Sequence, residues 1–323
     1  MKSDIITTIP IYNGEKFIGP TLESIARQTL SPDRVIVFDN CSTDRTEEMV
    51  KNFTGIRCEF IRNPTNIGLF QNFNRCLKLA AETQFLHILH ADDTIEPEFY
   101  RVMTQALDAG DVRGLGWCLD RRIDEKNQFL SLSGKVDKKR ELLDRDSFLK
   151  RKAEIGNQAF CATLLKTNRQ AAPCSFPLDY PILGDMIFWA AFGSHCQKII
   201  HVREALANYR WHGTNETILR APTIQSLILD EWRTMETNEM LRGIGWNLFR
   251  KLKLKGLLAV RSAIKAKRVR QNGDLDYSMR ITKAARGLTG RPLWMAGEIM
   301  VELRDFYLFT ILRRVRHPKN IYG

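Results

Sequence analysis

Residues 5–40 read IITTIPIYNGEKFIGPTLESIARQTLSPDRVIVFDN, in which two β-rich runs flank one helical pattern. The runs 5–9 and 34–38 are rich in Ile and Val, as buried strands are. Between them, apolar residues at 18, 22, 25 and 26 follow the spacing of one helix face. The stretch therefore predicts a strand, a helix and a second strand.

The same alternation continues beyond this stretch. Asp44 and Glu47 have the chemistry of a helix start, so a helix is expected to begin near Asp44. A strand at 58–61, a helix around 73–80 and a strand at 85–89 follow. Strands that alternate with helices are typical of a parallel sheet with crossover helices, so the predicted fold class is α/β.

After these strands the pattern is mixed, and after Ala221 it is helical to the end of the chain. The expected elements are strands at 115–119, 196–202 and 206–211, and helices at 141–152, 222–241, 246–270, 274–286 and 293–315.

The net charge of +12 belongs to the C-terminal part of the chain. Residues 240–323 hold 19 Lys and Arg against 5 Asp and Glu, whereas residues 1–239 hold 30 against 32. We therefore expect one near-neutral domain over 1–220 and a basic helical extension over 221–323. This asymmetry indicates contact with an anionic surface of lipid, nucleic acid or acidic glycan.

Composition excludes several classes of protein. With 44% hydrophobic and 27% charged residues, the chain has an ordinary globular composition. The seven cysteines include no CxxC pair, which argues against a disulfide framework or a zinc ribbon and favours a reducing compartment. No signal-peptide core and no long apolar stretch is present, so export and membrane spanning are disfavoured.

Polar clusters at 8–13, 39–44 and 90–93 directly follow predicted strands. Ligands of open α/β sheets bind at the carboxyl ends of strands, so these clusters are expected to share a site. The adjacent carboxylates of Asp92 and Asp93 suit Mg²⁺ or Mn²⁺, which could bridge a pyrophosphate. The first turn reads PIYNG rather than GxGxxG, and no P-loop motif occurs, which excludes those two nucleotide sites.

Taken together, four runs resemble glycosyltransferase family 2, the inverting GT-A class. They are residues 5–14, VFDNCSTD at 37–44, NPTNIG at 63–68 and LHADD at 89–93, and the resemblance spans about residues 3–215. It implies a GT-A fold with a mainly parallel central sheet, followed by the helical extension. It also implies transfer of a sugar from a UDP- or dTDP-sugar, with dTDP-rhamnose as one candidate, to a hydroxyl of a glycan or lipid-linked glycan in surface polysaccharide synthesis.

The resemblance assigns roles around the nucleotide. Pro10 and Tyr12 fall where the family lines the base, and Asp39 falls where a carboxylate accepts a hydrogen bond from the pyrimidine N3–H. Asn66 and Gly68 match the segment beside the nucleotide, where glycine lets the backbone approach closely.

The resemblance also implies a metal site for Mn²⁺ or Mg²⁺. Asp93 is expected to be a metal ligand, with Asp92 directed towards the ribose or the metal-bound waters. His90 stands where many relatives have the first Asp of the motif, so the atoms that touch the metal are left open.

An inverting transfer needs a base that takes the proton of the acceptor hydroxyl. The run PILGDMIFW at 181–189 matches the family's element, with Gly184 in place of Glu, and names Asp185 as the base. A plain helix N-cap is the structural alternative for Asp185, and Asp179 is the nearest rival. In YRWH at 209–212, His212 or Arg210 is expected to stabilise the departing diphosphate.

The basic extension has two open interpretations. The cationic helix at 246–270 either lies on an anionic bilayer or packs on the catalytic domain, and the helix from residue 293 is either interfacial or a homodimer contact. Together they favour peripheral attachment to the inner face of the cell membrane in the cytoplasm. No RNP, zinc-finger or helix-turn-helix signature accompanies the charge, so nucleic acid is not the expected partner.

Two other functions remain as alternatives. A nucleotidyltransferase also combines a nucleotide-binding α/β sheet with acidic metal ligands, although its glycine-rich basic loop is missing. A catalytically inactive GT-A-like binding module would explain Gly184 and His90, whereas Asp39, Asp93 and Asp185 argue against it.

Overall fold

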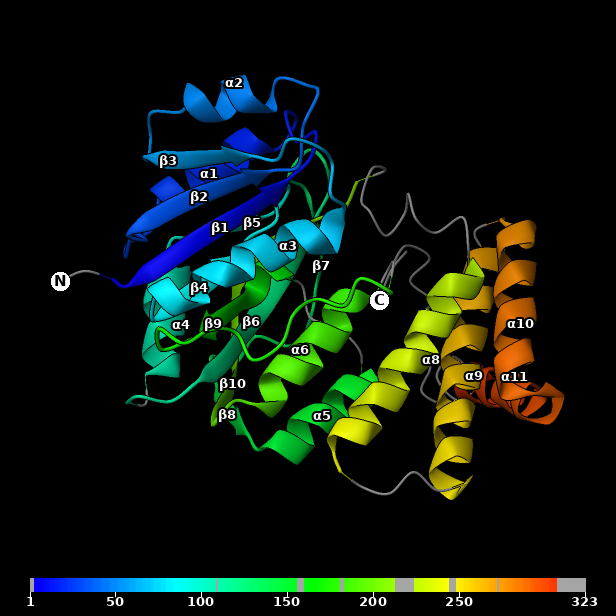
Figure 1. Ribbon diagram of the computed structural model, residues 1–323. Helices are drawn as coiled ribbons and strands as arrows, with labels where there is room; N and C mark the ends of the chain where they lie inside the picture. Colours follow the sequence, from blue (N-terminus) through cyan, green and yellow to red (C-terminus); the bar gives the residue numbers. More distant parts are fainter. Residues whose placement is uncertain are drawn as a thin grey trace. The chain divides into compact units, whose positions relative to one another are not determined.

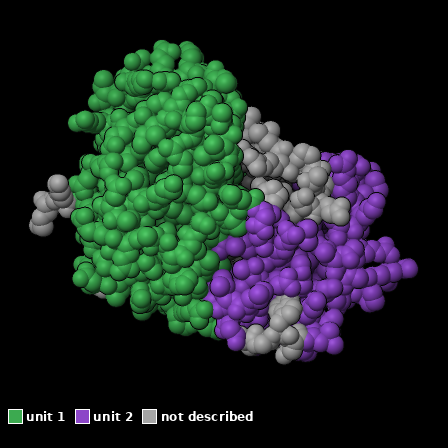
Figure 2. Space-filling view, viewed as in Figure 1, with its two compact units in different colours: residues 1–148, 157–178, 188–212 green, residues 149–156, 179–187, 213–323 purple. Residues whose placement is uncertain are grey.

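The computed structural model describes residues 3–108, 110–155, 160–180, 183–212, 224–243, 248–271 and 273–306. The chain forms two compact units, which Figure 2 colours separately. Unit 1 comprises residues 1–148, 157–178 and 188–212, and unit 2 comprises residues 149–156, 179–187 and 213–323.

Four parallel strands open unit 1 and confirm the predicted α/β class. They are β1 (Ile5–Ile11), β2 (Arg34–Asp39), β3 (Cys58–Arg62) and β4 (Phe85–Ile88). β1 is buried along its whole length and lies between β2 and β4. β1, β2 and β4 are buried almost throughout, as strands covered on both faces are, whereas β3 at the edge of the sheet is only partly buried and combines apolar and charged residues.

The helices between these strands are α1 (Ile18–Ala26), α2 (Thr46–Lys51) and α3 (Leu69–Leu77), and the 3₁₀ helix η1 (Lys78–Glu82) follows α3. Helix α3 packs on β1, β2 and β4. Helix α2 begins two residues after Asp44, because the Asp44 carboxylate accepts a hydrogen bond from the Thr46 N–H at 3.0 Å.

The sheet continues past β4 in the order β3-β2-β1-β4-β9-β6-β10-β5. The added strands are β5 (Thr94–Ile95), β6 (Gly114–Ile123), β7 (Phe129–Leu132), β8 (Arg140–Leu143), β9 (Thr163–Lys166) and β10 (Lys198–Arg210). β9 runs antiparallel between β4 and β6, and β6 is parallel to β10. Helix α4 (Phe99–Leu107) packs on β6 and β10, as Figure 1 shows.

Two sequence-based expectations are wrong. The strands predicted at 196–202 and 206–211 are one strand, β10, whose register shifts on either side of Ala205. Bulges at these points turn the chain without ending the strand. The helix predicted from residue 141 begins later, as α5 (Arg145–Ile155), because Arg140–Leu143 pairs with β10 as β8.

Two further helices contribute to unit 1. The 3₁₀ helix η2 (Phe160–Ala162) precedes β9, and helix α6 (Gly184–Ser194) begins in unit 2 and ends in unit 1. All seven cysteines are free, in agreement with the absence of a disulfide framework.

Unit 2 is helical, as predicted for the C-terminal region. Its helices are α8 (Ile224–Leu241), α9 (Leu248–Gln271), α10 (Leu275–Thr289) and α11 (Arg291–Phe306). Their core includes the fully buried Leu258, Ile281 and Ala285. Residues 307–315 of the last predicted helix lie outside the described residues. Among the described helices, none combines the length and apolar character needed to cross a membrane.

Candidate active site

The sheet brings the predicted polar clusters to one edge. Ile11, the last residue of β1, pairs with Asp39, the last residue of β2. On the other side of β1, the Leu89 N–H donates to the Thr8 carbonyl at 2.9 Å, so the loop after β4 begins beside the loop after β1. The expectation that these clusters lie together is therefore confirmed for the loops of unit 1.

The first turn of α1 holds the loop that carries the carboxylates. The Thr21 hydroxyl lies within hydrogen-bond distance of two carbonyl oxygens of this loop, those of Ala91 at 2.9 Å and Asp93 at 2.8 Å, as well as that of Phe17 at 3.2 Å. Because both contacts are to the backbone, they set the path of the loop and leave the carboxylates available.

Asp92 is fixed by His212 from the end of β10. His212 Nε2 lies 2.8 Å from Asp92 Oδ2, and since a carboxylate only accepts, His212 donates. Burial acts to raise the pKa of Asp92, but the hydrogen bond from His212 acts in the opposite direction, and the pKa lies below its usual value. Asp92 is therefore an anion that remains partly exposed.

Asp93 has the opposite electrostatic environment. Its side chain is fully buried, and Oδ1 accepts a hydrogen bond from the Arg210 main-chain N–H at 2.8 Å. Burial, followed by the negative charge of Asp92, raises the pKa of Asp93 well above its usual value. The pKa values of these two adjacent carboxyl groups are thus shifted in opposite directions, because ionisation of Asp92 disfavours ionisation of Asp93.

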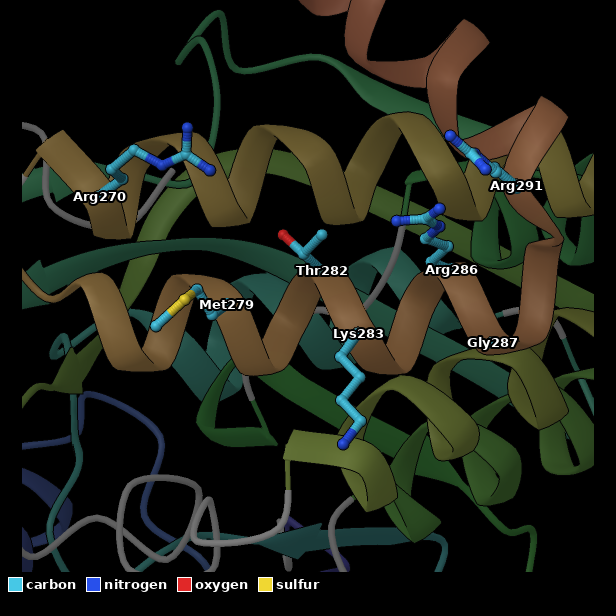
Figure 3. A pocket seen from close by; sticks show the side chains of 7 residues that line it. All are labelled: Arg270, Met279, Thr282, Lys283, Arg286, Gly287 and Arg291. Atoms are coloured by element: carbon cyan, nitrogen blue, oxygen red, sulfur yellow. The ribbon is translucent and has the colours of Figure 1, made fainter.

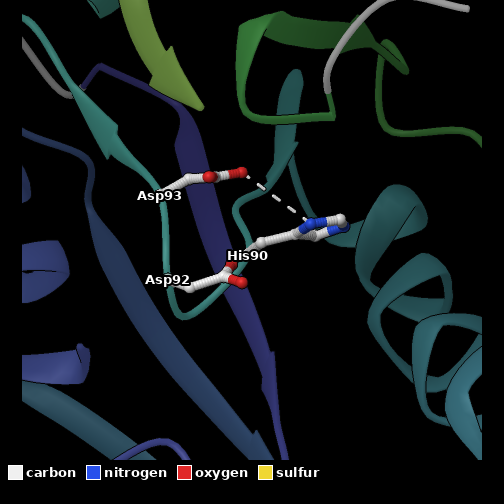
Figure 4. Close-up of side chains that lie close together, drawn as sticks. All are labelled: His90, Asp92 and Asp93. Atoms are coloured by element: carbon white, nitrogen blue, oxygen red, sulfur yellow. Dashed lines mark ion pairs between the residues drawn. The ribbon is translucent and has the colours of Figure 1, made fainter. Parts of the chain in front are cut away.

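His90 completes the cluster. Its Nδ1 lies 3.8 Å from Asp93 Oδ2, and its ring packs 5.4 Å from the ring of Phe73. Burial lowers the pKa of His90, which favours the neutral imidazole that can ligate a metal. Figure 4 shows His90, Asp92 and Asp93 projecting from one loop.

These three side chains fit a divalent cation. One ligand atom from each of His90, Asp92 and Asp93 lies within 4.8 Å of the others. Asp93 Oδ2 is buried and accepts no hydrogen bond from any residue that the structure describes. An unsatisfied buried carboxylate oxygen is costly, and a cation would satisfy it.

Arg210 supports the cluster from behind. Its side chain is almost fully buried and lies over the Phe17 ring at 5.0 Å. Nε donates to the Asp92 carbonyl at 2.8 Å, and Nη1 donates to Asn127 Oδ1 at 2.7 Å. Arg210 is thus used in holding the backbone at Asp92, so its predicted contact with a diphosphate stays a prediction.

On the nucleotide side, Asp39 is fully buried at the end of β2. Its Oδ2 accepts from the Ser42 N–H at 3.1 Å and lies 3.3 Å from Arg62 Nη1. The Ser42 hydroxyl also bonds to the Asp39 carboxylate and accepts from the Asn13 N–H at 2.8 Å. These bonds tie the loops after β1 and β2 together.

The other predicted nucleotide residues lie at the same strand ends. Pro10 is buried within β1, and Tyr12 follows this strand with 47% of its surface exposed. Asn66 Oδ1 accepts from the Asn40 amide at 2.8 Å and from the Gly68 N–H at 2.9 Å. Gly68 precedes α3 with φ of 87°, a left-handed backbone that favours glycine.

Asp185 lies in the first turn of α6, within unit 2, and is half-buried. Its rival, Asp179, is exposed. Further along α6, Phe188 and Trp189 are buried against Phe176 in unit 1. The predicted role of Asp185 as the base stays a prediction.

Sequence reasoning missed two buried neighbours of the cluster. Asp120 of β6 is a third carboxylate whose charge also raises the pKa of Asp93, and burial raises the pKa of Asp120 itself. It directly follows the predicted strand 115–119, so the strand-end rule could have found it. The second neighbour is the Cys161 thiol, whose pKa is raised well above its usual value by burial and then by the negative charge of Asp93, and no sequence signal pointed to it.

Residues 7–168, half of the chain, match the family described as Glycosyl transferase family 2. The chain belongs to this family. An uncharacterized glycosyltransferase of Haemophilus influenzae is 25% identical over 215 residues, which cover 64% of this chain and 64% of that protein. The match thus spans just under two thirds of that relative's length.

Solved structures share the fold of this family member. TarS 1-349 of Staphylococcus aureus in complex with UDP-GlcNAc has a TM-score of 0.57 at 16% identity, covering 94% of this chain and 92% of that chain. The mannosyltransferase PcManGT of Pyrobaculum calidifontis, in complex with GDP-Man and Mn²⁺, has a TM-score of 0.54 at 14% identity, covering 96% and 82%. The GT-A fold expected from the resemblance is confirmed.

Proposed function

We propose that the protein is a metal-dependent, inverting glycosyltransferase. It transfers a sugar from a UDP- or dTDP-sugar to a hydroxyl of a glycan or lipid-linked glycan in surface polysaccharide synthesis. The observation that carries this proposal is the His90, Asp92 and Asp93 cluster, which lies at the carboxyl end of β4 in a family 2 chain. The proposal is supported by the similarity to TarS, whose name is poly(ribitol-phosphate) beta-N-acetylglucosaminyltransferase.

Asp93, Asp92 and His90 would hold the cation, Mn²⁺ or Mg²⁺. When bound, the cation supplies positive charge to the diphosphate of the donor. Asp93 is the strongest ligand candidate because its buried Oδ2 accepts no hydrogen bond from the described residues. His212 orients Asp92 through the 2.8 Å hydrogen bond, and Arg210 orients both carboxylates through backbone contacts.

The nucleotide would lie along the ends of β1 and β2. The exposed Tyr12 ring offers a face for the base, and buried Pro10 shapes the strand end beneath it. Asp39 would accept from the pyrimidine N3–H in addition to its Ser42 and Arg62 contacts, and Asn66 and Gly68 would lie beside the nucleotide. The preference for uracil or thymine depends on Asp39.

Asp185 would take the proton from the acceptor hydroxyl as its oxygen attacks the anomeric carbon. The bond from that carbon to the diphosphate oxygen breaks as the new glycosidic bond forms, so a single in-line displacement inverts the configuration. The first turn of a helix also suits an N-cap aspartate, and the two roles differ in their effect on kcat.

Peripheral attachment to the cytoplasmic face of the membrane is a separate proposal. At the start of α9, Leu248 and Phe249 are 73% and 78% exposed beside Arg250 and Lys251. Exposed apolar and cationic side chains in one helical turn suit an anionic lipid surface.

The test of the proposed function is nucleotide binding to the purified protein. Thermal unfolding is followed with UDP, dTDP, GDP and CMP, each with and without Mn²⁺, for the wild type and Asp93→Ala. A shift with UDP or dTDP that requires Mn²⁺ and disappears in Asp93→Ala supports the proposal, since a ligand at 100 times its Kd adds about 2.7 kcal/mol. Absence of a shift with every nucleotide would instead favour an inactive binding module.

A further inference from the structure

Unit 2 contains a cleft of its own, between α9, α10 and the start of α11. Its volume is about 560 Å³, and Figure 3 shows the side chains that line it. The lining residues are Arg270, Met279, Thr282, Lys283, Arg286, Gly287 and Arg291. Four of these carry positive charge, and none is acidic.

One face of α10 provides most of the lining. Positions 279, 282, 283, 286 and 287 follow the spacing of residues that share one side of a helix. Arg270 from the end of α9 and Arg291 from the first residue of α11 add charges from the neighbouring helices. Three helices therefore contribute four exposed cations to the lining, and Figure 3 shows Arg286 near Arg291 at one end, with Arg270 at the other end.

These cations differ from other cations of unit 2 in having no acidic partner within the part of the chain that the structure describes. Among the described residues, no carboxylate lies within ion-pair distance of the four cleft cations. In contrast, Arg261 and Lys265 of α9 pair with the buried Glu231, and Lys267 pairs with Glu302 at 2.7 Å. Glu231 and Glu302 thus pair with cations outside the cleft, and the cleft lining carries positive charge only.

Open space lies beside Gly287 in the cleft lining. A Cβ at this position would meet no heavy atom within 4 Å, so no close packing requires glycine there. Glycine inside a helix lowers the stability of the helix relative to alanine, yet α10 has a glycine at this position of the cleft lining. The missing side chain leaves room for a ligand beside Arg286 and Arg291.

We propose that this cleft binds a phosphate group. Like charges held together repel one another, and a phosphate would remove this repulsion. Arginine presents paired N–H donors that match phosphate oxygens. The Thr282 hydroxyl donates to the Ser278 carbonyl at 3.0 Å, so the arginine and lysine side chains supply the donors. Met279, which is 62% exposed, lines the cleft with an apolar side chain.

The phosphate can belong to a membrane phospholipid or to a soluble phosphate polymer, and this site does not depend on the proposed transferase activity. Binding is measured with two probes at 150 mM NaCl, about physiological ionic strength. The probes are inorganic polyphosphate and vesicles of phosphatidylglycerol with phosphatidylcholine, with pure phosphatidylcholine vesicles as the reference.

The test variant is Arg286→Gln with Arg291→Gln. Its matched control is Arg57→Gln with Lys78→Gln, which removes the same charge from two exposed positions of unit 1. The cleft variant is expected to weaken binding about tenfold or more, because charge-assisted hydrogen bonds are lost, whereas the control should change it less than about threefold. A third variant, Gly287→Leu, keeps every charge and fills the cleft, and is expected to weaken binding similarly.

The binding measurements with polyphosphate and vesicles either support or overturn the proposed phosphate site. Binding of polyphosphate alone or of vesicles alone supports the site and identifies the source of the phosphate. Equal weakening in both double variants, or unchanged binding in a folded Gly287→Leu, would mean diffuse surface attraction and overturn the proposal, as would binding to neither probe. Mn²⁺-dependent UDP binding, measured in parallel, should be unchanged in all three variants, so failure here is distinct from failure of the proposed function.

Discussion

His212 Nε2 and Asp92 Oδ2 lie 2.8 Å apart, although the residues are 120 positions apart in the chain. The contact joins the end of β10 to the loop after β4, on either side of the intervening strands β9 and β6. Since Asp92 remains partly exposed while His212 is buried, the histidine orients the carboxylate and the carboxylate faces the ligand. His212 is a positioning residue for the candidate metal site.

His212→Ala is expected to weaken Mn²⁺ binding by about 10- to 100-fold, the range for loss of an outer-shell partner. Free Mn²⁺ is counted by electron paramagnetic resonance during a titration of the protein. His195→Ala, at an exposed histidine directly after the end of α6, serves as the control and should bind as the wild type does. Equal affinities in both variants would show that His212 does not position Asp92.

Asp185→Asn should lower kcat at least about 100-fold and leave donor binding nearly unchanged, because a general base acts on the acceptor and not on the donor. Turnover is measured once a donor sugar has been identified, and donor affinity is measured by calorimetry. Asp179→Asn is the matched control at an exposed carboxylate. A parallel loss of donor affinity in Asp185→Asn would refute the base assignment.

The buried His87 predicts a pH dependence of stability. Burial lowers its pKa to about 3, and its ring lies 3.0 Å from the Tyr100 hydroxyl and 3.1 Å from the Cys161 carbonyl. Below about pH 6.5 the His87 imidazole is protonated in the unfolded chain but stays neutral in the folded chain. The free energy of unfolding therefore falls as the pH drops from about 6.5 to about 3. Above about pH 6.5 this contribution of His87 to the free energy of unfolding is fully present.

The size of this effect is about 1.4 kcal/mol per pH unit within the window. Between pH 7 and pH 5, urea unfolding should show a loss about 2 kcal/mol larger in the wild type than in His87→Gln. The comparison variant is His195→Gln, whose exposed histidine should leave the wild-type pH dependence intact. The same loss in His87→Gln and wild type would contradict the assignment of the effect to His87.

Gly68 has φ of 87° and ψ of 162°, a combination that is essentially restricted to glycine. Gly68→Ala is expected to lower the free energy of unfolding by about 1 to 3 kcal/mol through backbone strain, since no atom would crowd the new Cβ. Gly256→Ala in α9 meets equally open space at an ordinary φ, so it should be neutral or stabilising by up to about 1 kcal/mol. Urea unfolding compares the two, and equal effects would argue against strain at Gly68.

The N-terminal half of the fold was predictable because its strands are buried on both faces and its helices have one apolar face. β1 and β2 begin at the predicted residues, Ile5 and Arg34. β8 was not predictable, because Arg140–Leu143 carries charged residues and is a strand only through its pairing with β10. For β10 the sequence predicts two strands instead of one, because the register shifts on either side of Ala205 interrupt the pattern of buried residues along the strand.

The site was predictable as a set of residue types and not as a set of contacts. Asp92, Asp93 and His212 were named from their motifs, whereas the hydrogen bond between Asp92 and His212 depends on a sheet that joins distant parts of the chain. Cys161 gave no signal because its position beside Asp93 depends on how η2 approaches the sheet. For the cleft of unit 2, the sequence likewise indicates only an excess of basic residues, because the cleft itself depends on the packing of three helices.

The most direct test of the central claim is ³¹P NMR of the protein incubated with UDP- and dTDP-sugars and Mn²⁺, with water as the acceptor of the sugar. The account predicts release of the nucleoside diphosphate, with loss of the signal when Mn²⁺ is omitted and in Asp93→Asn. Cleavage between the two phosphates, seen as formation of the sugar 1-phosphate and expected of a nucleotidyltransferase acting on a nucleotide-sugar, would contradict the proposed function. An undiminished rate of nucleoside diphosphate release in Asp93→Asn would also contradict it.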